Sequence, residues 1–149
     1  MKAALVCSSG GHLAQLYRLR GWWEDHERLW VTFDTPDATS LLATERVIWA
    51  HHPTTRNLRN ALRNLALAWR FLRRERPNVV VSDGAGVAVP FFVAARILGI
   101  KTVYVEVYDR IDTRTMAGKI CYPLSDLFCV QWEEQQRLYP RARLIGTLF

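Results

Sequence analysis

The first residues in the chain that could carry out chemistry lie in a loop directly after the apolar run at positions 2–7. In order, the loop consists of Ser8, Ser9, Gly10, Gly11 and His12. A short apolar run bounded by turn residues predicts a buried strand, and the stretch after the glycines can open a helix. Free N–H groups at such a junction attract phosphate. His12 is the one nearby side chain that moves a proton near neutral pH, so the loop predicts phosphate binding beside a general base; the alternative is a helix-capping histidine.

Two further polar loops follow apolar runs. The first, after positions 79–82, consists of Asp83, Gly84, Ala85 and Gly86. Its backbone amides suit a diphosphate, although Asp83 can equally serve as a helix cap. The second, over 106–114 at the end of the apolar run that starts at 101, contains Glu106, Asp109, Arg110 and Arg114. Glu106 or Asp109 can act as a base or hold a sugar, and the arginines can clamp phosphate. The alternatives are an ion pair of Glu106 with Arg110 and a solvated loop.

The elements that must position these loops alternate between strands and helices. Apolar runs predict strands at 2–7, 28–33, 46–49, 79–82, 101–107, 127–130 and 143–145. Helical spacing of apolar residues predicts helices over 57–75 and 87–98, in addition to the one after His12. This alternation predicts an α/β protein with a Rossmann-like, doubly wound parallel sheet. Ligands bind at the carboxyl ends of the strands in such sheets, so the three polar loops should converge on one crevice.

Composition limits the possible functions. The chain has 149 residues, half of them hydrophobic, which is typical of one globular domain spanning 1–149. A net charge of +6 favours an anionic partner. Three cysteines without metal spacing indicate reduced thiols and no metal site, with Cys7 a core residue. We expect no signal peptide, no membrane-spanning helix and no cofactor, and no nucleic-acid recognition motif is present.

The predicted helix over 57–75 places apolar residues, among them Leu58, Leu62 and Leu65, on one face and arginines on the other. One interpretation is a solvated face on a helix that packs its leucines on the sheet. The other is attraction to an anionic membrane, with tryptophans as interfacial anchors. The residues assigned to membrane contact are Trp22, Trp23, Arg59, Arg63, Trp69, Arg70, Arg73 and Arg74. Trp22 and Trp23 are expected in a loop after the first helix.

The motifs at 8–13, 80–86 and 104–106 together resemble one family of split glycosyltransferases. It is the acceptor-side, membrane-anchoring subunit of two-component UDP-sugar transferases of lipid-linked oligosaccharide and bacterial polysaccharide synthesis (PssD/CpsF type). The chain is also similar to the N-terminal half of MurG. The eukaryotic anchoring subunits carry an N-terminal transmembrane helix, whereas this sequence begins at its first predicted strand.

The resemblance implies one half of a GT-B enzyme that binds a lipid-diphosphate-linked saccharide. The UDP-sugar would bind a separate partner subunit in a heterodimer, and the chain would sit peripherally on the cytoplasmic face of the inner (plasma) membrane. In an inverting transfer, His12 or Glu106 would be the catalytic base. Two alternatives stay open: a non-catalytic membrane scaffold for a separate transferase, and a dinucleotide-binding oxidoreductase that uses Asp34 for the ribose. Against the latter, the first loop is not GxGxxG.

Overall fold

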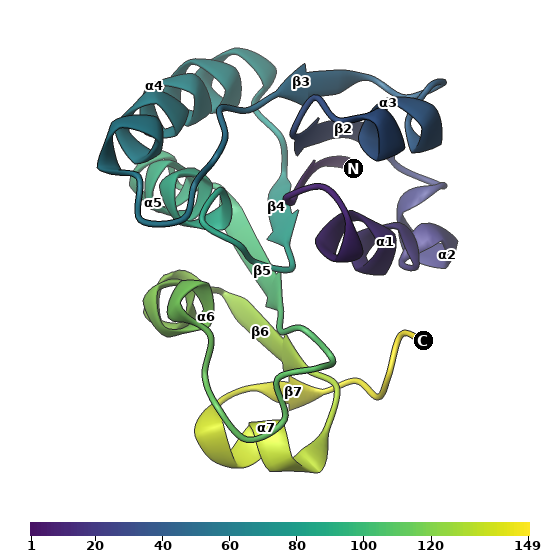
Figure 1. Cartoon of the computed structure of the whole chain (residues 1–149), viewed down its shortest axis with the longest axis vertical. Helices are drawn as coiled ribbons and strands as arrows, with labels where there is room; N and C mark the ends of the chain where they lie inside the picture. The colour runs from purple at the N-terminus through teal and green to yellow at the C-terminus, as the bar shows by residue number, and fades with distance from the viewer.

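A single parallel sheet of seven strands organises the molecule, in a computed structural model that describes residues 1–149 (Figure 1). The strand order is β3-β2-β1-β4-β5-β6-β7, and every neighbouring pair is parallel. The strands are β1 (Lys2–Val6), β2 (Glu27–Thr32), β3 (Val47–Trp49), β4 (Val79–Ser82), β5 (Lys101–Val105), β6 (Leu127–Val130) and β7 (Arg143–Leu144). The predicted α/β doubly wound fold is confirmed.

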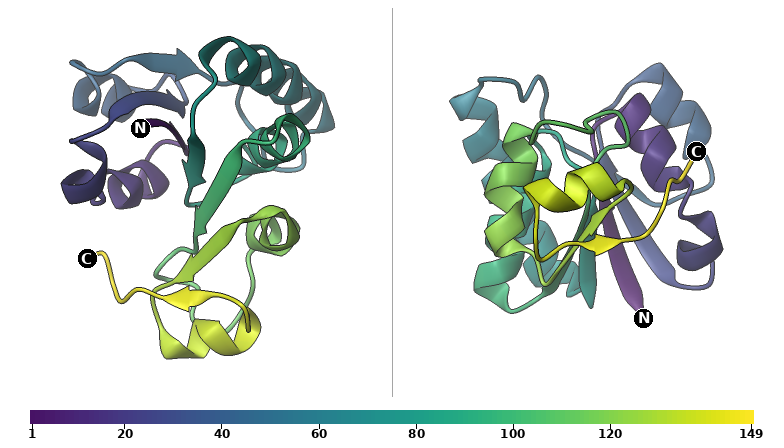
Figure 2. Two further views of the ribbon diagram at one scale, coloured as in Figure 1. Left: turned by 180° about the vertical axis from the view of Figure 1, so that it is seen from behind. Right: turned by 90° about the horizontal axis from the view of Figure 1, so that it is seen from below.

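Helices cover both faces of this sheet (Figures 1 and 2). On one face lie α4 (Leu58–Glu75), α5 (Ala88–Leu98) and α6 (Met116–Cys121), packed over a core of 23 buried residues. On the other lie α1 (Gly11–Tyr17), α2 (Arg20–Trp23) and α3 (Pro36–Leu41), over a second core of 11. A 3₁₀ turn, η1 (Tyr122–Leu124), precedes β6, and α7 (Glu133–Leu138) packs beside β6 and β7. This two-sided cover explains why the central strands read as continuous apolar runs.

All seven predicted strands are confirmed, with one boundary that matters. The strand predicted over 101–107 ends at Val105, which places Glu106 at the carboxyl end of β5. The tryptophan prediction was wrong in part. Trp22 and Trp23 lie on α2 rather than in a loop, and Trp23 is only 2% exposed because it packs edge-to-face on Trp30 in the second core. Trp23 therefore has no surface to offer a membrane.

The long helix α4 is present as predicted, but the face that its first turns bury differs from the predicted one. Leu58 and Leu62 are 75% and 58% exposed, whereas Asn60 and Asn64 are buried. The asparagines are buried because each has backbone partners: Asn64 bonds both the N–H and the carbonyl of His51, at 2.8 and 2.9 Å. Buried polar groups that keep their hydrogen bonds cost little, so these contacts set the rotation of the helix. The interpretation that α4 packs its leucines on the sheet was wrong for Leu58 and Leu62, whereas Leu72 is buried and Leu65 packs against the core.

The ends of α4 follow local rules. Asn57 accepts a hydrogen bond from the Asn60 N–H at 3.0 Å, which caps the first turn. Arg76 closes the last turn in a left-handed conformation with φ of 49°, immediately before Pro77. None of the helices combines the length and apolar character needed to cross a bilayer.

Candidate functional site

The site lies where three adjacent strands end. Because β1, β4 and β5 are neighbours and parallel, the loops that follow them share one edge of the sheet. Side-chain contacts join them: His12, after β1, reaches Asp83, after β4, and Gln15 on α1 accepts a hydrogen bond from the N–H of Tyr108, after β5. The predicted convergence of the three polar loops is therefore present in the structure.

His12 is held in one tautomer by the loop after β4. Its Nδ1 atom lies 3.1 Å from the Asp83 backbone carbonyl oxygen, which can only accept a hydrogen bond. Nδ1 must therefore donate, and the lone pair of the neutral ring is left on Nε2. The Asp83 carboxylate lies 3.5 Å from the same Nδ1, and the His12 side chain is 29% exposed. This is the arrangement that a general base requires: one nitrogen anchored, the other free to take a proton.

The charges around His12 favour its protonated form. Burial alone lowers the pKa of His12, but hydrogen bonding and Coulombic attraction to Asp83, with a further attraction to Asp109, outweigh burial and raise it. Burial raises the pKa of the Asp83 carboxyl to about 6, against the opposing effect of His12 and Gln15. Asp83 is fully buried, and its Oδ1 has no hydrogen-bond donor. An incompletely paired buried carboxylate beside a partly exposed histidine marks a candidate site of proton transfer.

Sequence reasoning missed two buried glutamines. Gln15 on α1 donates from Nε2 to Asp83 Oδ2 at 3.2 Å, and its Oε1 accepts from Gln131 Nε2 at 2.8 Å and from the Tyr108 N–H at 3.2 Å. Gln131, after β6, also donates to the Glu106 carbonyl at 2.9 Å. The only signal in the sequence was that Gln15 stands between Leu13 and Leu16, on the buried side of the first helix turn.

Glu106, the second predicted base, lies in a different environment. Its side chain is fully buried, and its carboxylate accepts hydrogen bonds from Tyr139 Oη at 2.6 Å, from Thr115 Oγ1 at 3.1 Å and from the Val107 N–H at 3.0 Å. These donors join α6, α7 and the strand end, so the carboxylate stabilises the fold around β5. The predicted ion pair with Arg110 is absent: Arg110 instead bonds Thr113. The structure does not support proton transfer by Glu106, because it has no open oxygen facing the crevice.

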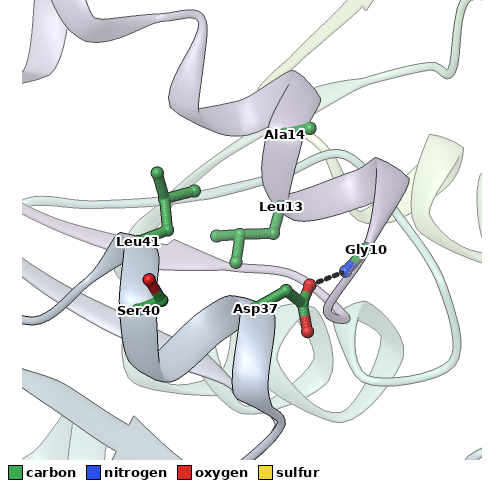
Figure 3. A pocket seen from close by; sticks show the side chains of 6 residues that line it. All are labelled: Gly10, Leu13, Ala14, Asp37, Ser40 and Leu41. Atoms are coloured by element: carbon green, nitrogen blue, oxygen red, sulfur yellow. Dashed lines mark hydrogen bonds between the residues drawn. The ribbon is translucent and has the colours of Figure 1, made fainter.

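The glycine loops are partly occupied by the protein itself. The Gly10 N–H donates to Asp37 Oδ2 at 2.8 Å, and the Gly84 N–H donates to Ser82 Oγ at 3.1 Å. The Asp37 contact borders an open pocket of about 410 Å³ between α1 and α3 (Figure 3). Gly10, Leu13, Ala14, Asp37, Ser40 and Leu41 line it. An acidic side chain already holds one amide that the sequence assigned to phosphate, so phosphate binding by Ser8, Ser9 and Gly11 stays a prediction.

The loop after β4 needs glycine at position 84. Gly84 has φ of +114°, and a Cβ there would lie 2.6 Å from the Tyr104 hydroxyl and 3.5 Å from His12 Cε1. The Tyr104 hydroxyl is buried without a hydrogen-bond partner. The next residue, Ala85, also has a positive φ, of 61°. A strained loop pressed against the histidine brings the Asp83 carbonyl to Nδ1.

The charged loop after β5 is exposed and flanks the site. Asp109 is near enough to His12 to raise its pKa. Arg114 stacks over the Tyr139 ring at 5.3 Å, and Gln135 Nε2 holds the Arg110 carbonyl at 3.0 Å. Both arginines are exposed residues of this loop, and their assignment as phosphate clamps stays a prediction.

The remaining candidates do not join this site. Cys7 is buried as predicted, and burial raises the pKa of its thiol. Asp34, the ribose ligand of the oxidoreductase alternative, contacts Thr39 through Oδ1 at 3.4 Å. No three His, Cys, Asp or Glu side chains stand close enough together to hold a metal ion.

Comparison with known proteins places the chain in a family. Residues 39–148 match the family described as "Oligosaccharide biosynthesis protein Alg14 like". The chain belongs to the Alg14 family. The human UDP-N-acetylglucosamine transferase subunit ALG14 is 29% identical over 97% of this chain and 81% of its own length. The corresponding protein of Eremothecium gossypii is 34% identical, over 61% of this chain and 46% of its own length.

Solved structures agree on the fold. The chain superposes on MurG of Acinetobacter baumannii with a TM-score of 0.78 at 16% identity, covering 99% of this chain and 45% of that one. UDP-GlcNAc 2-epimerase of Neisseria meningitidis gives 0.80 at 11% identity, with 99% and 47% covered. The chain spans about half the length of these structures. At such low identity the likeness shows a Rossmann-like, GT-B type fold alone.

Proposed function

We propose that this Alg14-family chain is the acceptor-binding, catalytic-base half of a split inverting glycosyltransferase of the bacterial polysaccharide (PssD/CpsF) type. One observation carries the proposal: His12 is held at the carboxyl edge of the sheet with Nδ1 on the Asp83 carbonyl and Nε2 available. Membership of an oligosaccharide-biosynthesis family supports a saccharide acceptor. The word "subunit" in the relatives' names supports a partner, and the match to half of MurG supports the division of labour.

The proposed step needs only groups of this chain on the acceptor side. As the acceptor hydroxyl oxygen bonds the anomeric carbon of a UDP-sugar held by the partner, His12 Nε2 takes its proton and UDP leaves with the bonding electron pair. The Asp83 carboxylate stabilises the imidazolium that forms, and Asp109 adds to the same field. Glu106 is left out of the proposal because its carboxylate is saturated by donors from the fold.

A binding and turnover experiment tests the division of labour. The purified chain alone should neither bind UDP-N-acetylglucosamine at micromolar concentration nor turn it over. Addition of a separately purified UDP-sugar-binding subunit should restore transfer to a lipid-diphosphate-linked saccharide. Calorimetry that detects micromolar binding of the nucleotide sugar to this chain by itself would contradict the proposal.

We infer that membrane contact, if the acceptor is lipid-linked, uses the α4–α5 face. An open, mostly apolar groove of about 160 Å³ lies between these helices, lined by Ala61, Leu62, Leu65, Gly86, Val89, Pro90 and Val93. Arginines are exposed along α4, and the Arg73 guanidinium stacks on Trp69 at 6.0 Å. Apolar side chains beside cations are the pattern that binds an anionic bilayer surface peripherally. Trp22 lies on α2, across the sheet from α4, so one flat membrane would not touch both (Figure 1).

Vesicle sedimentation tests this surface. Binding should require anionic lipid, weaken at high salt, and fall both for the triple change of Arg70, Arg73 and Arg74 to glutamine and for the double change of Leu58 and Leu62 to glutamine. Trp22→Ala, on the opposite face, is the matched control and should bind as the unmodified chain does. Equal binding to neutral vesicles, or no binding at any salt concentration, would assign the arginines to a solvated face. We propose that this surface binds the cytoplasmic face of the inner membrane.

A non-catalytic scaffold is the competing function, because it uses the same fold, partner and membrane face. It differs in making His12 dispensable for turnover. Substitution of His12 in the reconstituted pair therefore separates the two functions.

A further inference from the structure

Gln15 is the one buried polar side chain that joins the His12–Asp83 pair to the loops on the far side of the site. It is 1% exposed, and it lies three residues after His12 on the same short helix, α1. Its amide nitrogen reaches Asp83, whereas its amide oxygen faces the segment after β5 and the residue after β6. Four strand ends therefore meet at this side chain.

The contacts fix the amide in one orientation. Gln15 Oε1 accepts from two donors, the Tyr108 N–H at 3.2 Å and Gln131 Nε2 at 2.8 Å. A flipped amide would turn its NH₂ group toward both donors, leaving them without an acceptor, and it would turn its oxygen toward a carboxylate. Gln131 is held in turn, since its Nε2 also donates to the Glu106 carbonyl at 2.9 Å and its Oε1 accepts from the Leu148 N–H at 3.0 Å. Nε2 of Gln15 is therefore always presented to Asp83.

We propose that Gln15 is a positioning residue whose locked amide N–H keeps the Asp83 carboxylate ionised and turned toward His12. Its catalytic meaning rests on the proposed role of His12 as the base. Gln15 supplies the one hydrogen-bond donor that the Asp83 carboxylate receives from another side chain at Oδ2, while Oδ1 lacks a donor and is left to face His12. A carboxylate this deeply buried that loses its side-chain donor takes up a proton more readily and becomes a weaker counter-ion.

The other titratable groups around the pair do not replace this donor. Cys7, at the end of β1, and Tyr104, on β5, both have pKa values raised by burial and by neighbouring negative charge, so they stay neutral near pH 7. Asp109, in the loop after β5, raises the pKa of His12 but is exposed and not part of the buried pair. Among side chains, His12, which lies 3.5 Å from Oδ1, and Gln15, which donates to Oδ2, are the two that favour the ionised form of Asp83.

The test is a pH titration of His12 in the chain alone, monitored by NMR of ¹³C-labelled histidine. The His12 signal is assigned as the one that is missing from the spectrum of His12→Ala. In Gln15→Met the pKa of His12 should fall by about 1 unit, since a neutral Asp83 no longer stabilises the imidazolium. Gln136→Met is the control, because Gln136 lies on α7, bonds only the Ala142 carbonyl and should leave the titration of His12 unchanged. In an Asp83→Asn background, Gln15→Met should have no further effect.

An unchanged His12 titration in folded Gln15→Met, or an equal fall in the Asp83→Asn background, would overturn the proposal. If Gln15→Met does not fold, Gln131→Met removes one of the two donors that lock the amide, and a smaller fall of the His12 pKa is then expected. The measurement uses neither partner nor substrate, so it does not depend on the proposed function. In the reconstituted pair, the acidic limb of the pH–rate profile should move in the same direction as the NMR titration.

Discussion

Two buried carboxylates end neighbouring strands of this sheet, and their surroundings are opposite. Asp83, after β4, has one side-chain donor on Oδ2, none on Oδ1, and a partly exposed histidine at 3.5 Å. Glu106, after β5, accepts from Tyr139, Thr115 and a backbone N–H, with no open face. Burial raises the pKa of Asp83 to about 6. A saturated carboxylate stabilises a fold, whereas an under-satisfied one is available for chemistry.

The difference comes from which elements surround each strand end. The loop after β5 is followed by α6, whose capping residue Thr115 bonds both the Gly118 N–H and Glu106. The loop after β4 contains Gly84 and Ala85 with positive φ, and in this conformation the backbone carbonyl of Asp83 faces His12. The Asp83 side chain is left with few hydrogen-bond donors. Two acidic residues at equivalent places in the sheet thus acquire different roles from their neighbours.

Loss of the histidine is the largest expected effect. His12→Ala in the reconstituted enzyme should lower kcat by roughly 10²–10⁴-fold, the range for removal of a general base. The measurement is steady-state transfer with saturating UDP-sugar, and His26→Ala, in the segment after α2, serves as the control. Near-normal turnover of folded His12→Ala would leave His12 only a structural contact with the Asp83 carbonyl and favour the scaffold function.

The second largest expected effect is the contribution of Asp83 to the pH dependence of stability. Because the folded protein raises the pKa of Asp83 from 3.8 to about 6, Asp83 stabilises the fold most below pH 3.8, and that contribution, about 3 kcal/mol, is lost as pH rises through 6. The raised pKa of His12 acts in the same direction at higher pH. Urea unfolding should therefore show Asp83→Asn gaining stability relative to the unmodified chain between pH 4 and pH 7. If the stability difference between Asp83→Asn and the unmodified chain does not change with pH, the pKa of Asp83 is not raised by folding.

Catalysis and stability should divide between the two carboxylates. Asp83→Asn should lower kcat by about 10–10²-fold with the fold intact, because the imidazolium loses its counter-ion. Glu106→Gln should keep turnover within about threefold but lose roughly 1–3 kcal/mol of stability, because charge-assisted bonds to Tyr139 and Thr115 weaken. Turnover and chemical denaturation of both variants, measured side by side, decide this. The reverse pattern would return the catalytic role to Glu106.

The strained loop gives the smallest expected effect. Gly84→Ala should destabilise the protein by about 1–3 kcal/mol and lower activity, since the backbone has φ of +114° and the new Cβ meets the Tyr104 hydroxyl. Gly99→Ala, with φ of +73° in open space at the end of α5, should cost only about 1 kcal/mol and leave activity unchanged. Equal thermal shifts for the two variants would remove the argument that the loop is pressed against the site.

Much of the fold could be predicted because its signals are local. Apolar runs such as 79–82 and 127–130 predicted β4 and β6 at their observed bounds. The alternation of strands and helices fixed a parallel sheet, and parallel strands bring their carboxyl ends together whatever the side chains are. The convergence of His12 with Asp83 follows from that rule alone.

Other features depend on contacts between distant residues. The buried face of α4 was predicted wrongly in its first turns, because Asn60 and Asn64, which bond the backbone of Pro53 and His51, are buried in place of Leu58 and Leu62. Trp23 is buried for a similar reason, through its packing on Trp30. A hydropathy pattern places polar residues at the surface. It contains no information on the distant hydrogen-bond partner that offsets the loss of hydration when such a residue is buried.

The sequence by itself determined the sheet, the place of the crevice and the presence of one histidine and several carboxylates at its edge. Only the tertiary structure decided which carboxylate is paired with His12, which nitrogen of that ring is free, and that Gln15 joins the pair to the strands beyond it. The physical reason is that strand order follows from local periodicity and chain geometry. The hydrogen bonds of a buried carboxylate come from donors that lie 68 and 33 residues away in the chain, as for Gln15 with Asp83 and Tyr139 with Glu106.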